Sequence, residues 1–195
     1  MRIVHIGAAV GLLSFALPAA AQQPKLPPEL VALRTQLDKY QNPIVAVHDG
    51  YFSSVGCVEY PQGATEGSMQ YPAGGMGVHF LNFQNIGPTL DPSKPQVLIY
   101  EPVGDSLRLV AAEWFMPAQL AGASPPAVFG KPLQGPMEGH VPLMPPEFHH
   151  YDLHVWLWKD NPAGIFSPTN PTLKCPGKGY SFAEKAPKMV HKHGK

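Results

Sequence analysis

The chain has 195 residues, a formal net charge of zero at pH 7 and only 14% charged residues. This balance gives no basic excess for binding a nucleic acid and no acidic tail for a charged partner, so neither is expected. With 24 prolines, 19 glycines and 44% hydrophobic residues, the composition favours one compact, loop-rich domain with a sizeable core over a helical bundle.

The first 21 residues have the three parts of a secretory signal peptide. Arg2 precedes an apolar run from Ile6 to Leu17, and residues 19–21 are all alanine. A membrane anchor is the alternative, but this run is shorter than the roughly 20 apolar residues that a membrane span needs. We expect cleavage after Ala21, a mature chain without a membrane span, and a periplasmic or secreted location.

Two cysteines, Cys57 and Cys175, lie in the early part and at the end of the mature domain. An even pair in an exported protein most simply forms one disulfide, and no C-x-x-C spacing supports the alternative of metal-binding thiolates. We expect a single domain over residues 22–177, followed by a flexible basic tail over residues 178–195.

Apolar residues at helical spacing mark the start of this domain. The stripe consists of Leu30, Leu33, Leu37 and Tyr40. Pro28 suits the first turn of such a helix, and Pro43 ends it. Residues 44–53 fit either a second short helix or a strand, and we favour the helix.

Alternating apolar residues predict strands in the rest of the chain. One candidate covers residues 76–83, and residues 96–101 and 107–115 form the clearest hairpin. Glu101 opposite Arg108 would give this hairpin an oppositely charged cross-strand pair. We therefore predict an α+β fold in which one or two N-terminal helices pack on an antiparallel β-sheet or partly open barrel, held by one disulfide.

The segment at residues 148–158 is the densest in ionisable and aromatic side chains. As a strand it would bury Tyr151, Leu153 and other apolar residues on one face. The opposite face would carry Phe148, His150, Asp152, His154, Trp156 and Trp158. Two histidines four residues apart on a strand are separated by about 13 Å and cannot share one ion, whereas the aspartate between them can pair with either.

Two residues elsewhere are the best additional ligand candidates. His79 follows a glycine-rich approach at residues 74–77 that could admit a backbone or a ligand. Glu113 lies in an apolar series, where an isolated carboxylate is costly, although an ion pair with Arg108 is an alternative. The predicted metal ligands are His79, Glu113, His149, His150, Asp152 and His154. Imidazole with carboxylate suits copper, zinc or iron.

A second metal option lies in the proline-rich stretch at residues 136–150. It combines thioethers with imidazoles, a mixture that favours copper. Its candidate ligands are Met137, His140, Met144 and His149. Packing and turn formation are the simpler interpretation of these methionines.

Aromatic side chains near the histidines suggest a small-molecule pocket, with Tyr100, Trp156 and Trp158 as its predicted wall. The chain contains no P-loop and no G-x-G-x-x-G in a strand–helix context, so no nucleotide is expected. It also lacks the C-x-x-C-H motif, so no covalent haem is expected.

Two longer motifs resemble those of a group of uncharacterised bacterial exported proteins. The first is the sequence GMGVHF at residues 75–80. The second is the sequence LHVWLWK at residues 153–159, with Asn161-Pro162 shortly after it. The resemblance spans most of the mature domain, but the group has no established activity. It implies only that His79 and His154 belong to the recurring pattern.

These observations favour an exported metal-binding domain with a His/carboxylate site, and action on a small molecule is one version of this hypothesis. Two alternatives remain: a metal-free module that binds a small molecule in a His/Trp-lined pocket, and a structural envelope protein. No motif in the sequence identifies the protein as an enzyme or indicates a protein partner.

Overall fold

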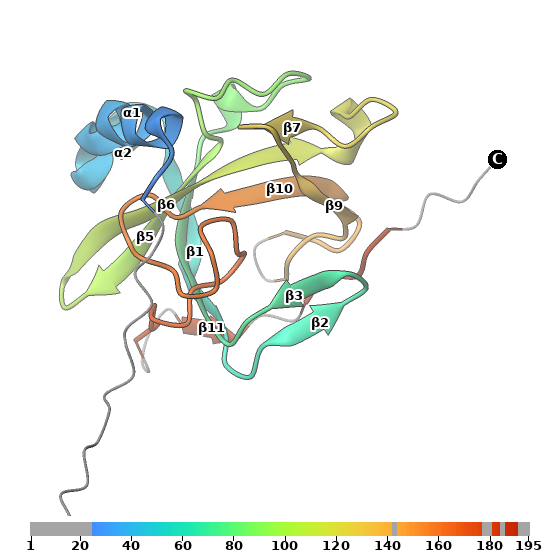
Figure 1. Cartoon of the computed structure of the whole chain (residues 1–195). Helices are drawn as coiled ribbons and strands as arrows, with labels where there is room; N and C mark the ends of the chain where they lie inside the picture. The colour runs from blue at the N-terminus through green and yellow to red at the C-terminus, as the bar shows by residue number, and fades with distance from the viewer. Residues whose placement is uncertain (1–24, 142–143, 177–180, 184–185, 191–195) are drawn as a thin grey trace, which may run out of the picture.

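A computed structural model describes residues 25–141, 144–176, 181–183 and 186–190 (Figure 1). The predicted signal peptide lies outside these residues. The described chain begins with three short helices that pack together beside the sheet. They are α1 (Pro28–Leu37), the 3-10 helix η1 (Asp38–Gln41) and α2 (Pro43–His48).

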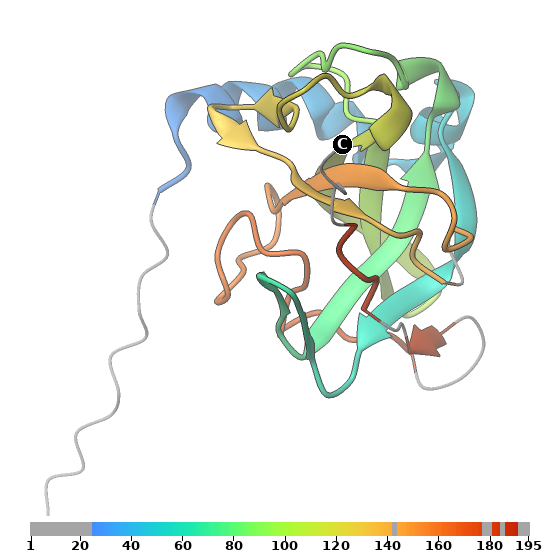
Figure 2. The same ribbon diagram turned by 90° about the vertical axis from the view of Figure 1, so that its right-hand side faces the viewer.

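A seven-stranded sheet forms the body of the fold, with the strand order β11-β1-β4-β5-β6-β10-β9. Its strands are β1 (Phe52–Tyr60), β4 (Gly74–Leu81), β5 (Val97–Val103), β6 (Ser106–Pro117), β9 (Gln134–Met137), β10 (His150–Val155) and β11 (Ser181–Ala183). Neighbouring strands are antiparallel except β11, which runs parallel to β1. Figure 2 shows β10, in orange, lying at a steep angle to the long strand β4.

Two small hairpins and two further 3-10 helices lie outside the seven-stranded sheet. They are the hairpin of β2 (Ala64–Glu66) with β3 (Met69–Tyr71), the hairpin of β7 (Ala127–Val128) with β8 (Lys131–Pro132), and the 3-10 helices η2 (Phe83–Asn85) and η3 (Ala118–Leu120). The β2–β3 hairpin occupies a stretch rich in glycine and proline. Its two strands are only three residues long, too short to give a clear alternating pattern in the sequence.

The predicted apolar helical stripe is buried in the main core, against one face of the sheet. Val78 and Phe80 of β4 and Tyr151 and Leu153 of β10 reach the same core from the sheet side. Because side chains alternate along a strand, the residues between them face the opposite side of the sheet. The α+β prediction is confirmed: short N-terminal helices pack on a largely antiparallel sheet that does not close into a barrel.

The predicted disulfide between Cys57 and Cys175 is confirmed, with Cα atoms 5.5 Å apart and a sequence separation of 118. In the chain-entropy picture, closing a loop of this length stabilises the fold by roughly 4.7 kcal/mol. The disulfide fixes the segment after β10 against β1, and the same segment also contacts β4. There Gly75 donates a backbone hydrogen bond to Asn170 and accepts one from it. The glycine-rich stretch before His79 therefore packs directly against the backbone of the segment around Asn170.

Two short described stretches, residues 181–183 and 186–190, lie within the predicted C-terminal tail. Residues Ser181–Ala183 form β11 beside β1. Further along, Lys188 accepts a hydrogen bond from Glu138, and Val190 donates one to Pro136. These contacts are made by backbone groups, so the basic composition of this stretch gave no signal for them.

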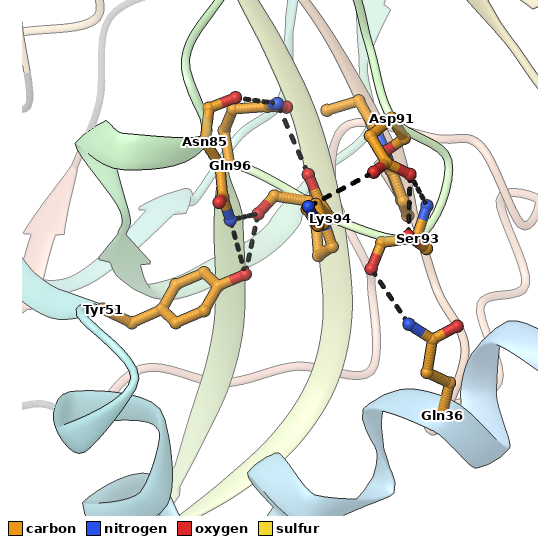
Figure 3. A network of polar contacts seen from close by, with 9 residues as sticks. Gln36, Tyr51, Asn85, Asp91, Ser93, Lys94 and Gln96 are labelled. Carbon is orange, nitrogen blue, oxygen red and sulfur yellow. Dashed lines mark hydrogen bonds and ion pairs between the residues drawn. The ribbon is translucent and has the colours of Figure 1, made fainter.

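The loop between β4 and β5 is held by a polar network (Figure 3). The Asn85 amide donates to the Tyr51 hydroxyl at 3.1 Å, and that hydroxyl donates to the Pro95 carbonyl at 2.8 Å. Gln96 donates to the Asn85 carbonyl, and its own side-chain oxygen accepts from the Phe115 amide at 2.9 Å. The loop is thereby tied to β6, the strand that carries Glu113.

Candidate metal centre

Strand β10 supplies three ionisable side chains to the sheet face that points away from the helices. His150, Asp152 and His154 alternate with core residues, as the strand interpretation predicted. In the antiparallel register, His154 pairs with Glu113 of β6, and Asp152 pairs with Phe115. The pairing thus brings a carboxylate from one strand beside an imidazole of the next.

The first cluster consists of His79, Glu113 and His154. The Nε2 atoms of both histidines lie 3.7 Å from Glu113 Oε2. The two rings are perpendicular, with centroids 6.1 Å apart. The three residues come from β4, β6 and β10, and their side chains are at most 8% exposed. One candidate ligand atom from each lies within 4.8 Å of the other two, so this group can hold a metal ion.

The second cluster consists of His140, His150 and Asp152, whose candidate ligand atoms also lie within 4.8 Å of one another. Asp152 Oδ2 lies 3.6 Å from His140 Nε2 and 3.5 Å from His150 Nε2. A thioether borders this group, because Met137 Sδ lies 3.3 Å from His140 Nε2. Tyr71 donates its hydroxyl hydrogen to the same sulfur at 3.7 Å.

Burial controls the protonation of the first cluster. Desolvation, together with the neighbouring histidines, lowers the pKa of His79 to about 3. Desolvation likewise lowers the pKa of His154 to about 4, although Asp152 acts in the opposite direction. At neutral pH both rings are uncharged, which is the form in which histidine binds metals.

The pKa of Asp152 shows the opposite balance. Burial alone would raise it, but the close His150 imidazole and the electrostatic effect of the other nearby histidines outweigh burial and lower the pKa to about 2. Asp152 is therefore an ionised, buried carboxylate at neutral pH. The second cluster thus combines the deprotonated acid and the imidazoles that a metal ion requires.

Some ring nitrogens in the clusters are buried without satisfying a hydrogen bond. Within the described residues, neither nitrogen of His154 has a hydrogen-bond partner, and the same holds for Nε2 of His150. Buried polar atoms in native proteins are nearly always satisfied, so exceptions point to a water molecule or an ion. The donor set and these nitrogens fit a metal ion in both places.

Both clusters meet one cavity of about 320 Å³. His79 and Glu113 of the first cluster and His140 and Asp152 of the second line it, whereas His154 and His150 do not. The rest of the lining is apolar and comprises Phe52, Met76, Leu81, Phe83, Ile86, Val97, Phe115, Met144, Pro145 and Phe148. A few polar groups within an apolar wall are typical of a small-molecule site.

Five of the six predicted ligands lie in the two clusters, and His149 lies in neither. The predicted pocket residues lie elsewhere than the cavity. Tyr100 donates its hydroxyl to the Tyr40 carbonyl within the helix-side core. Because β10 ends at Val155, the alternation stops there, and the side chains that follow no longer share the face of the clusters.

The two tryptophans after β10 donate to other parts of the fold. Trp156 donates its indole N–H to the Ser167 carbonyl at 2.7 Å, and Trp158 donates to Asp38 Oδ1 at 2.6 Å. Conversely, the structure adds His140 to the second cluster. The sequence singled it out only as part of the methionine-rich copper option, since a proline-rich loop has no periodicity from which to place a side chain.

Comparison with protein-family models, curated proteins and solved structures finds no match to this chain. No helix among the described residues is long and apolar enough to cross a membrane.

Proposed function

We propose that this protein is an exported metal-binding domain whose two clusters each bind one transition-metal ion beside a small-molecule cavity. The observation that carries the proposal is the presence of two buried groups, each with two imidazoles and one carboxylate within ligand distance of one another. The disulfide supports an oxidising compartment.

The donor sets favour different metals. Two histidines and a carboxylate, as in the first cluster, suit zinc or non-haem iron with coordination positions left open. The second cluster has the same set with the Met137 thioether beside it, and a soft sulfur donor favours copper. We therefore assign zinc or iron to the first cluster and copper to the second.

The residues around the cavity fit a role in chemistry on a bound molecule. A metal ion held here would polarise an oxygen atom or activate water. His79, Glu113, His140 and Asp152 would hold the ions at the polar end of the cavity. The apolar wall would exclude bulk water and orient the molecule.

The cavity itself supports a second candidate, a metal-free binding module. Its lining is mostly apolar, and the imidazoles and carboxylates could bind a polar group directly. The two candidates differ in whether binding requires a metal.

Elemental analysis of tag-free protein purified from the periplasm separates them. We expect up to two equivalents of transition metal, with the Glu113→Gln variant losing one and the His140→Ala variant losing the other. His149→Ala is the matched control, because this histidine neighbours the site but belongs to neither cluster. Replacing His191 and His193 in every sample removes adventitious binding at the C-terminal end. Metal-free protein that still binds small molecules would favour the second candidate.

A further inference from the structure

We propose that the cavity binds a small phenol-like molecule, with its ring packed against phenylalanine side chains and its hydroxyl group at the two clusters. This inference deepens the proposed function by naming a ligand class. The test is carried out with and without metal, so the ligand class can be refuted while the proposed metal sites stand.

The polar end of the cavity selects the functional group of the ligand. Two carboxylates, Glu113 and Asp152, line this end together with His79 and His140. Carboxylates accept hydrogen bonds and repel anions, so they favour a hydroxyl donor over a carboxylate or phosphate. A metal ion bound at either cluster would add affinity for the same oxygen, since phenolates are oxygen ligands.

The walls select a flat ring. Phe115 and Phe148 are nearly parallel, at 6° and with centroids 6.0 Å apart. Phe52 and Phe83 also line the cavity, with centroids 5.4 Å apart, and they are 46% and 59% exposed. Aromatic rings attract one another beyond the simple burial of area. Exposed paired rings at a cavity therefore offer a surface on which another ring gains contacts.

The size of the cavity limits the ligand. Its volume of about 320 Å³ is near the lower end of the roughly 300–1,000 Å³ that small-molecule sites span. A molecule with one or two rings suits it better than a nucleotide or a peptide.

The test uses 4-nitrophenol, whose absorbance reports its ionisation, titrated into zinc-loaded and EDTA-treated protein at pH 6. We expect saturable binding to both forms, with at least tenfold higher affinity and the absorbance of the phenolate in the zinc-loaded form. Nitrobenzene, which lacks the hydroxyl group, should bind about tenfold more weakly, and 4-nitrobenzoate should bind the metal-free form more weakly than 4-nitrophenol does.

Two wall variants test the position of the ring. Phe83→Ala and Phe148→Ala should each weaken 4-nitrophenol binding about three- to tenfold, the range that one aromatic contact contributes. Neither should change the zinc content. Leu120→Ala is the control, because this leucine is also exposed but lies outside the cavity.

The outcomes separate the two proposals. Zinc uptake without 4-nitrophenol binding overturns the ligand class and leaves the metal sites standing. Binding to metal-free protein without any zinc uptake supports the ligand class and overturns the metal sites. Equal binding of nitrobenzene, or wall variants that bind as the wild type does, overturns the phenol-like ligand.

Discussion

Replacing Glu113 with glutamine should remove metal-dependent stabilisation while keeping the shape of the side chain. Glu113 is 5% exposed, and its Oε2 atom lies 3.7 Å from the Nε2 atoms of His79 and His154. Glutamine offers a neutral amide in place of a charged oxygen ligand. The metal affinity of the first cluster should therefore fall.

The size of the effect follows from linkage. At a free metal concentration 100 times the dissociation constant, one bound ion stabilises the fold by about 2.7 kcal/mol. A hundredfold loss of affinity, about the upper range for mutating a residue that only orients a metal ligand, lowers this to about 0.4 kcal/mol. For a chain of this size the difference corresponds to a melting temperature about 5–9 °C lower.

The assay is thermal unfolding of wild type and variants, each with excess zinc and each with a chelator. Only the increment between the two conditions is compared, so any effect of the substitution on the metal-free fold cancels. The matched control is Glu101→Gln. Glu101 lies on the neighbouring strand β5 and is 7% exposed. Its carboxylate forms an ion pair with Lys159 Nζ at 3.1 Å. Its variant should lose stability in both conditions and keep the full increment. An undiminished increment in Glu113→Gln would refute the first metal site.

Three further predictions concern pH, copper and the disulfide. Because burial holds the pKa of His79 and His154 at about 3 and about 4, the unfolded chain takes up protons below pH 6.5 before the folded chain does. Metal-free protein should thus have its full stability above pH 6.5 and lose up to about 1.4 kcal/mol per histidine per pH unit towards pH 4. Urea unfolding at pH 7 and at pH 5 measures this loss. Equal free energies of unfolding at the two pH values would contradict the prediction. Met137→Leu should lower Cu(I) affinity about tenfold in a chelator competition and leave zinc affinity unchanged, whereas Met116→Leu in the core should change neither. Cys57→Ser should lower the free energy of unfolding by about 2–5 kcal/mol, and an unchanged value would contradict the stabilising role of the disulfide.

The parts of the site that depend on strand periodicity were predictable. Alternation along residues 148–158 placed His150, Asp152 and His154 on one face, and the structure has them there. Glu113 was recognisable because a carboxylate in an apolar series requires a partner. The hairpin register with Glu101 opposite Arg108 is likewise confirmed.

The parts that depend on where a strand ends were not predictable. Trp156 continues the apolar pattern of β10, but its amide donates to the Ile165 carbonyl and the regular strand ends at Val155. The cavity walls come from separate strands and loops. Phe83 and Phe148 are far apart in the sequence, and only the folded chain places them around one cavity. His140 reaches its cluster from a loop, through tertiary contacts that no local pattern encodes.

Anomalous diffraction from crystals of metal-loaded protein tests the central claim most directly. Data recorded at the zinc and copper absorption edges should give one peak among His79, Glu113 and His154 and a second among His140, His150 and Asp152. Met137 should lie beside the copper peak. Crystals of fully loaded protein with no anomalous peak at either cluster, or with peaks only at surface histidines such as His48, would contradict the account.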